Sequence, residues 1–148
     1  MTDDTDTPKA RILLIEDNPG DVRLTKKAFD NVGLEHTLTV ASDGEKALAT
    51  LRDSDGGDAR DINLILLDLN LPGMSGLDIL SVLKADSDLK RIPVVILSSS
   101  SENQDIENSY DRHAAAYLSK PTSFQGLERM AGAIKDFWID EVQYASRE

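Results

Sequence analysis

The sequence predicts an α/β fold: a doubly wound, five-stranded parallel sheet with helices on both faces. One observation is that five short strand-like segments, four of them apolar runs and one alternating polar and apolar, lie between segments of helical periodicity. Strands that alternate with helices in this way form right-handed βαβ units, and such units build a parallel sheet. A second observation is that the run at 62–67 is almost continuously apolar, as expected of a strand covered on both faces.

The first strand and the first helix are predicted close to the amino terminus. Residues 11–15 form an apolar run, and Asn18 with Pro19 supplies a helix N-cap and a first-turn proline. Apolar residues at four-residue spacing give the helix one buried face as far as about residue 32. Gly33 is expected to end this helix.

An edge strand and a second helix come next. Residues 36–40 alternate polar and apolar side chains, which is typical of an edge strand exposed on one side. The second helix is expected over about 43–52. The Gly-rich and Asp-rich segment 53–61 is predicted to be a mobile acidic loop.

The alternation continues through the second half of the chain. The strand that ends at Asp68 precedes a helix over about 75–85, and a strand at 94–97 precedes a helix over about 102–112. The segment 114–118 is the last apolar run. These elements complete the five strands of the predicted sheet.

The final helix is predicted to begin near Ser123, where an apolar stripe at three- and four-residue spacing follows. The stripe consists of Phe124, Leu127, Ala131, Ile134 and Trp138. It continues to Val142 and Ala145, and one copy of so small a chain does not fully cover such a stripe. Self-association into a homodimer is therefore a further hypothesis.

Composition and charge limit the class of protein. At 148 residues and 40% hydrophobic content, the chain suits one domain with a proper core and leaves little room for a DNA-binding output domain. We expect a polar, disordered tail at 1–9, a domain at 10–138 and a helical extension at 139–148.

The net charge of −11 argues against binding to nucleic acid and to anionic membranes, because both require clustered Lys and Arg. The excess of acid fits either life in high salt or an ordinary acidic protein. The absence of cysteine and of a membrane-length apolar stretch leads us to expect a cytoplasmic protein.

Polar side chains stand where the predicted strands end. They are Glu16, Asp17, Asp68, Ser98 and Lys120. Ligands bind at the carboxyl ends of the strands in open parallel sheets, so these groups are expected to share one edge. Taken singly, each has a simpler explanation: acids are favoured at a helix N-terminus, a serine can cap a turn, and a lysine can be solvated.

Three carboxylates on one edge would repel one another unless a cation lay between them. Carboxylates and backbone carbonyls are the ligands that a hard divalent ion prefers. Mg²⁺ commonly keeps several waters and bridges to a phosphate oxygen. The three acids are therefore compatible with a site for a hard divalent cation, although a helix N-terminus alone would also explain the acidic pair Glu16 and Asp17.

The ordered set of polar groups resembles the receiver domain of two-component response regulators. The residues that carry the resemblance are Glu16 with Asp17, Asp68 within DLNLPGMSG, Ser98, Tyr117, and Lys120 with Pro121. The segments EDNPGD, DLNLPGMSG and RIPVVILSSS are most similar to single-domain regulators that partner phytochrome-type sensor kinases. The resemblance covers roughly residues 10 to 138 and implies a flavodoxin-like sheet with strand order 2-1-3-4-5.

The resemblance implies a phosphoprotein of a phosphorelay. Asp68 would accept a phosphoryl group from a sensor histidine kinase, and Lys120 and Ser98 would bind phosphoryl oxygens. The chain would then change conformation and signal to a downstream protein target. This is signal transduction by a switch, and not an enzyme's turnover.

The resemblance also assigns the metal ligands. Asp17, Asp68 and the backbone carbonyl of Asn70 would bind Mg²⁺ directly, while Glu16 would act through water.

For the switch, the resemblance implies that Tyr117 turns inward when Ser98 moves toward the phosphate; alternatively, Tyr117 is simply a core residue.

The resemblance also implies two features of the backbone. The bond between Lys120 and Pro121 is expected to be cis. His113 stands where the family usually has Gly, so a positive φ is expected there, and we interpret this histidine as structural.

Two other functions remain open. One is a Mg²⁺-dependent phosphatase or phosphotransferase with an Asp nucleophile, but such enzymes usually carry a second acid two residues later, where this chain has Asn70. The other is a pseudo-receiver that binds a partner without phosphorylation, which the intact set of polar residues disfavours.

Overall fold

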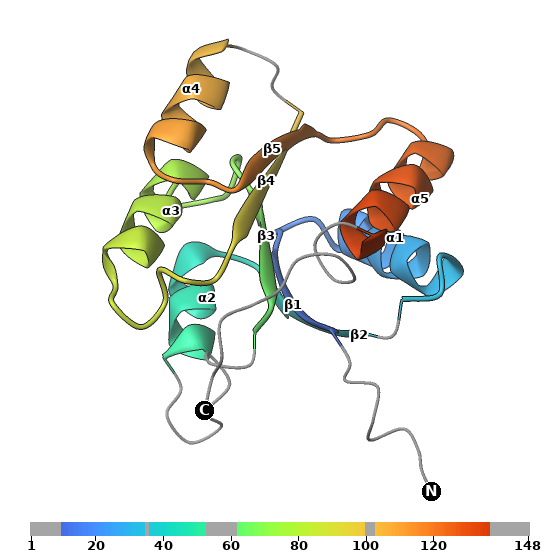
Figure 1. Ribbon diagram of the computed structural model, residues 1–148, viewed down its shortest axis with the longest axis horizontal. Helices are drawn as coiled ribbons and strands as arrows, with labels where there is room; N and C mark the ends of the chain where they lie inside the picture. The colour runs from blue at the N-terminus through green and yellow to red at the C-terminus, as the bar shows by residue number, and fades with distance from the viewer. Residues whose placement is uncertain (1–9, 35, 53–61, 100–102, 137–148) are drawn as a thin grey trace, which may run out of the picture.

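The computed structural model describes residues 10–34, 36–52, 62–99 and 103–136 (Figure 1). Several predictions lie outside these residues: those for the tail at 1–9, the loop at 53–61, Trp138 and the extension at 139–148.

Five parallel strands form one sheet in the order β2-β1-β3-β4-β5. The strands are β1 (Ala10–Ile15), β2 (His36–Ala41), β3 (Leu64–Asp68), β4 (Val94–Ser98) and β5 (Ala116–Ser119). This confirms both the predicted fold class and the predicted strand order.

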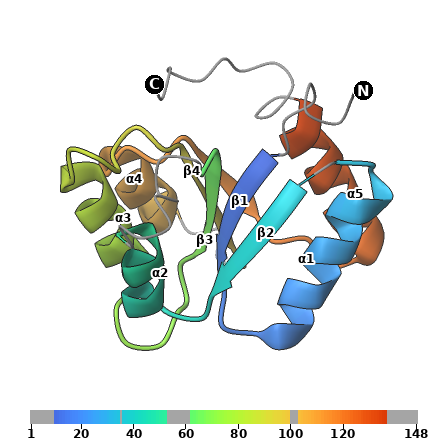
Figure 2. The ribbon, with the colours of Figure 1, turned by 90° about the horizontal axis from the view of Figure 1, so that it is seen from below.

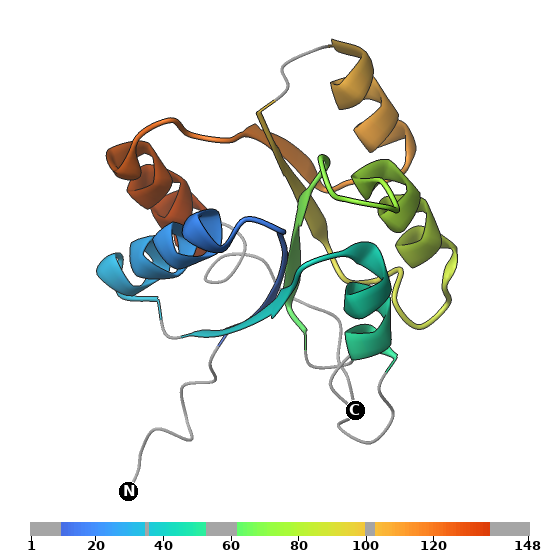
Figure 3. The same ribbon diagram turned by 180° about the vertical axis from the view of Figure 1, so that it is seen from behind.

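Helices cover both faces of the sheet, as Figures 1 and 3 show from opposite sides. One face carries α1 (Pro19–Asn31) and α5 (Phe124–Ala133). The other face carries α2 (Gly44–Leu51), α3 (Gly76–Ala85) and α4 (Asn103–Asp111).

The central strands β3 and β4 are buried at every residue. Successive side chains point to opposite faces, which divides the core into two layers. Toward α2 and α3 lie Leu13, Ile15, Ile65, Leu67 and Ile96. Toward α1 and α5 lie Ile12, Leu14, Leu64, Leu66 and Val95. The continuous apolar run of the third strand follows from this double coverage.

Four helices begin with the same hydrogen bond from a backbone N–H to the side chain of an N-cap residue. The N-caps are Asn18 for α1, Asp43 for α2, Ser75 for α3 and Ser123 for α5. Helices α1 to α4 begin and end within two residues of the predicted boundaries, and α5 begins at Phe124, next to the predicted start at Ser123. Gly33 follows α1 with a φ of 76°, as its predicted role at the helix end requires.

β2 and β5 are the edge strands of the sheet, which confirms the prediction for 36–40. Figure 2 shows β2 outermost beside β1. Its apolar side chains are only partly covered: Leu38 packs against the core, whereas Val40 is 42% exposed. A strand with a neighbour on one side alone has less of its surface covered.

His113 has a φ of 70°, the one positive φ at a non-glycine residue in the described part of the chain. It follows α4, where its N–H donates to the Tyr110 carbonyl over 2.9 Å and the Ala114 N–H donates to Ser109 over 3.0 Å. The expected left-handed geometry is confirmed, and its role is to end the helix.

Candidate functional site

The sheet order brings the predicted polar residues to one edge. β3 lies between β1 and β4, and all strands are parallel, so their carboxyl ends meet. Glu16 follows β1, Asp68 ends β3, Ser98 ends β4, and Lys120 follows β5. This is the edge at which open parallel sheets bind ligands.

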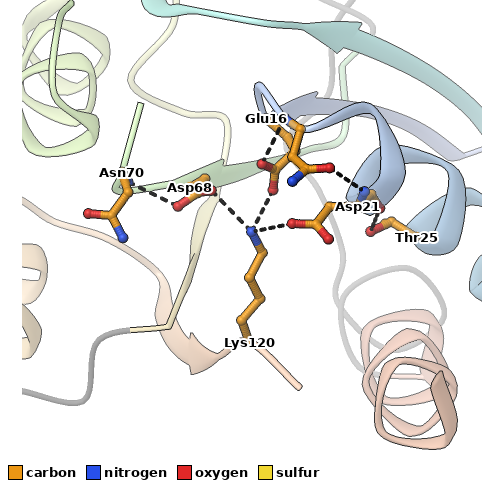
Figure 4. A network of polar contacts seen from close by, with 7 residues as sticks. Glu16, Asp21, Thr25, Asp68, Asn70 and Lys120 are labelled. Atoms are coloured by element: carbon orange, nitrogen blue, oxygen red, sulfur yellow. Dashed lines mark hydrogen bonds and ion pairs between the residues drawn. The ribbon is translucent and has the colours of Figure 1, made fainter. Parts of the chain in front are cut away.

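The ammonium group of Lys120 contacts three carboxylates (Figure 4). Its Nζ lies 2.8 Å from Glu16 Oε1 and 3.1 Å from Asp68 Oδ2. The third partner is Asp21, whose Oδ2 also lies 3.1 Å away. The side chain of Lys120 thus crosses from β5 to the ends of β1 and β3 and joins them electrostatically.

The buried carboxylate of Asp68 has a partner on each oxygen. Oδ2 faces Lys120, and Oδ1 accepts the backbone N–H of Asn70 over 3.0 Å. The turn after β3 runs close to α3: a Cβ on Gly76 would lie 2.6 Å from Leu69 Cα and 2.7 Å from the Asp68 carbonyl oxygen. Only glycine permits this approach, so Gly76 helps to fix the backbone that carries Asp68.

Glu16 is also buried, and its second oxygen, Oε2, accepts the backbone N–H of Asn18 over 3.2 Å. Burial raises the pKa of Glu16 above its ordinary value of 4.5; the hydrogen bond from Lys120 opposes this shift, and repulsion by Asp68 reinforces it. Burial therefore disfavours the charged form of Glu16, and an added cation would reduce that cost.

For Lys120, burial affects the pKa less strongly than the hydrogen bonds taken together do. Burial lowers the pKa of Lys120, but the hydrogen bonds to the three carboxylates outweigh burial and raise the pKa above its ordinary value. The amine therefore stays protonated at neutral pH.

Glu16, Asp17 and Asp68 offer one ligand atom each, all within 4.8 Å of one another. Hard oxygen donors at this spacing fit a divalent cation, and Asp17 is exposed, so one side of the cluster is open to solvent. The acidic cluster can therefore hold a divalent metal. The Asn70 carbonyl as a further ligand stays a prediction.

Ser98 lies at the predicted edge but is fully buried, with 0% of its surface exposed. Its carbonyl oxygen accepts the backbone N–H of Lys120 over 2.8 Å. Tyr117 is half-buried against the core and pairs with Ile96 of β4. The structure thus places both residues beside the site, while their switching roles stay predictions.

The expected cis bond before Pro121 is wrong: the structure has no cis peptide bond in its described residues, so Lys120–Pro121 is trans. Lys120 is directed inward by other contacts. These are the backbone bond to Ser98 and the ion pairs of its amine.

Sequence reasoning missed Asp21. Its place in the sequence contains a signal, because Asp21 lies in the first turn of the predicted helix that directly follows Glu16 and Asp17. The helix that follows a strand begins at the edge where the strand ends, so a further acid at the same edge could have been expected.

Comparisons with known proteins agree with this geometry. The sequence profile of the response regulator receiver domain matches residues 12–131. Response regulator Rcp1 from Synechocystis sp. is 38% identical over 143 residues, which cover 96% of this chain and 97% of Rcp1. In the part of the chain that the structure describes, no helix combines the length and the apolar character needed to cross a membrane.

Solved structures show the same similarity. The phosphorylated cyanobacterial phytochrome response regulator RcpA is 38% identical, with a TM-score of 0.85 and coverage of 94% of this chain and 100% of RcpA. The Mn²⁺-bound form of Rcp1 is 38% identical, with a TM-score of 0.82 and the same coverage, 94% and 100%. Fold, ordered polar residues and relatives agree, and the chain belongs to the response regulator receiver domain family.

Proposed function

We propose that Asp68 accepts a phosphoryl group in a Mg²⁺-dependent reaction and that the chain acts as a signalling switch. One observation carries the proposal: Lys120 Nζ lies 3.1 Å from Asp68 Oδ2 beside an acidic cluster that can hold a divalent cation. A carboxylate with a cation on each side can accept a group whose oxygens carry negative charge.

In the proposed transfer, a carboxylate oxygen of Asp68 attacks phosphorus and forms an O–P bond. The P–N bond of a phosphohistidine on a sensor histidine kinase breaks, and its electron pair goes to the histidine nitrogen. The attacking group is a carboxylate, which has no proton to lose, so this attack requires no general base. Lys120 neutralises one phosphoryl oxygen, and the Ser98 hydroxyl donates to another.

Asp17, Asp68 and the Asn70 carbonyl are the residues that would hold Mg²⁺ directly, with Glu16 acting through water. The bound ion would neutralise charge on the phosphoryl oxygens. The carboxylates identified above supply the hard donors that this requires.

The names of the relatives support the kind of partner. RcpA is described as a phosphorylated cyanobacterial phytochrome response regulator, and Rcp1 as a response regulator in a Mn²⁺-bound form. The partner that we propose is therefore a phytochrome-type sensor histidine kinase. On phosphorylation, Ser98 would move toward the phosphate and Tyr117 would turn inward, which changes the surface offered to a downstream target protein.

The residue at position 70 favours a switch over an enzyme. A Mg²⁺-dependent phosphatase or phosphotransferase with an Asp nucleophile needs a group that can exchange a proton with the leaving group, and the amide of Asn70 cannot do so. A pseudo-receiver that works without phosphorylation would not need the ion pair between Lys120 and Asp68.

The domain organisation is also part of the proposal: a receiver domain at 10–138, preceded by the tail at 1–9 and followed by the extension at 139–148. The profile match at 12–131 supports its central part. A homodimer formed through the end of the last helix is a further proposal, which sedimentation with and without phosphorylation would test.

The experiment is phosphorylation by acetyl phosphate in Mg²⁺ or in a chelator, read by intact mass. We expect one added phosphoryl group, dependent on the metal and abolished by Asp68→Asn. Asp78→Asn is the matched control, because Asp78 is an exposed acid in the first turn of α3. Equal labelling of Asp68→Asn and wild type would overturn the assignment.

A further inference from the structure

The contact between Asp21 and Lys120 has no part in the proposed transfer. Of the three carboxylates on Lys120, Glu16 and Asp68 belong to the group of possible metal ligands, and Asp21 does not. The ammonium thus has two partners that a metal would also use and one that a metal would leave free.

Two hydrogen bonds fix the backbone of Asp21, although its side chain is 41% exposed. Its N–H donates to the Asn18 N-cap over 3.1 Å, and its carbonyl accepts the Thr25 hydroxyl over 2.8 Å. Figure 4 shows its carboxylate directed from α1 toward the Lys120 amine. The first turn of α1 is therefore fixed in a position that presents this acid to Lys120.

A divalent cation and an ammonium group compete for the same carboxylates. A metal ion held by the cluster draws on the charge of Glu16 and Asp68, and it also repels Lys120, because like charges a few ångströms apart interact strongly in a partly buried site. Phosphoryl transfer requires both cations at once. Asp21 is the counter-charge that remains with Lys120 under these conditions.

We propose that Asp21 is a positioning residue: it retains the Lys120 ammonium at the site when a divalent cation engages Glu16 and Asp68. The inference rests on the proposed function, since it concerns a site that holds both a metal and a lysine. It adds a residue that serves the reaction through Lys120 and need not touch the phosphoryl group.

The alternative is that Asp21 is only a favourable acid at a helix N-terminus. α3 provides the comparison. Asp78 occupies the equivalent position in its helix, with its N–H bonded to the Ser75 N-cap over 3.2 Å, and it forms no ion pair with any described residue. If the helix end were the whole explanation, neutralising Asp21 and neutralising Asp78 would have the same effect.

The test is titration of the full chain with Mn²⁺ alone, in which the free ion is followed by electron paramagnetic resonance. Asp21→Asn should weaken Mn²⁺ binding by about fivefold, because Lys120 then pairs more strongly with Glu16 and Asp68. Asp78→Asn should weaken binding by less than about twofold. Asp21→Glu, which keeps the charge, should restore most of the affinity.

A double-mutant cycle shows whether Asp21 acts through the lysine. In a Lys120→Met background, Asp21→Asn should weaken Mn²⁺ binding by about twofold or less. The same fivefold loss in both backgrounds would mean that Asp21 attracts the metal by its own charge, and this would overturn the inference. If Lys120→Met does not fold, equal losses for Asp21→Asn and Asp78→Asn, or no rescue by Asp21→Glu, would overturn it.

The result also separates the two proposals. If wild-type protein binds Mn²⁺ and the variants do not differ, the role of Asp21 is wrong and the metal site stands. If wild-type protein binds no divalent cation, the metal-dependent function fails, and the role of Asp21 fails with it.

Discussion

The backbone N–H of Lys120 donates to the carbonyl oxygen of Ser98 over 2.8 Å, which ties together two residues that we propose to bind the phosphoryl group. The bond lies at the end of the β4–β5 pair, where Ser98 is in register with Ser119. Because it uses backbone atoms alone, the position of Lys120 does not depend on the Ser98 hydroxyl. The two functions of Ser98 can therefore be separated by mutation.

Ser98→Ala should still accept phosphate, because Asp68 and Lys120 keep their places. Loss of the buried hydroxyl should lower the free energy of unfolding by only about 1 kcal/mol. Transmission should fail, because the group that senses the phosphoryl oxygen is gone. The measurement compares amide chemical shifts around Tyr117 with and without beryllofluoride, and an identical response in wild type and variant would show that the hydroxyl is a bystander.

Glu16 gives the site a dependence on pH. Its pKa is higher in the folded protein than the ordinary 4.5, chiefly because of burial, so the folded state binds the proton more tightly than the unfolded chain. This contribution to stability is fully present below pH 4.5 and is lost as pH rises toward the folded pKa.

The Glu16→Gln variant cannot ionise at this position, so it lacks the loss of stability that wild type shows as pH rises. In a chelator, the variant should gain stability relative to wild type as pH rises above 4.5, in urea unfolding measured at several pH values. Adding Mg²⁺ should reduce or reverse the gain, because bound metal stabilises the folded wild type and the variant binds it less well. A difference between the two proteins that stays constant from pH 4 to 8 would contradict this account.

The sequence was sufficient to predict which polar residues the strand ends bring to one edge. Asp68 could be placed at the end of a buried central strand because a continuous apolar run precedes it, and the resemblance then gives the strand order. The positive φ at His113 was predictable for a similar local reason, since a helix end constrains the backbone.

The contacts made by Lys120 were less predictable. Its pairing with Asp21 depends on how the first turn of α1 is directed, across 99 residues of chain. Local patterns do not contain this contact, because it is set by the distance between α1 and the end of β5.

Gly76→Ala should destabilise the protein by about 1–3 kcal/mol, because the new Cβ would lie 2.6 Å from Leu69 Cα, a backbone atom that cannot easily move. The matched control is Gly132→Ala in α5, where the nearest atom, a Val32 methyl, is 4.0 Å away. Alanine is a better helix former than glycine, so the control should stabilise by about 0.5–1 kcal/mol. Urea unfolding measures both, and equal effects would show that α3 is not packed tightly against the turn after Asp68.

The last prediction concerns Tyr110, whose hydroxyl accepts the backbone N–H of Tyr117 over 3.1 Å. β5 is an edge strand, so this N–H points away from β4, and α4 provides its acceptor although Tyr110 is 48% exposed. Tyr110→Phe removes the oxygen and keeps the ring. The Tyr117 amide should then exchange with solvent about five times faster, which corresponds to one lost hydrogen bond of about 1 kcal/mol.

Exchange measured by NMR gives a direct control, because the Ala115 N–H donates to the Val94 carbonyl over 2.8 Å and does not involve Tyr110. Its exchange rate should stay close to that of wild type. If both amides accelerate equally, the variant has loosened β5 as a whole and the hydroxyl has no specific role. If only Tyr117 responds, this hydrogen bond joins α4 to the backbone of the proposed switch residue, and a change at Tyr117 must either carry α4 with it or break the bond.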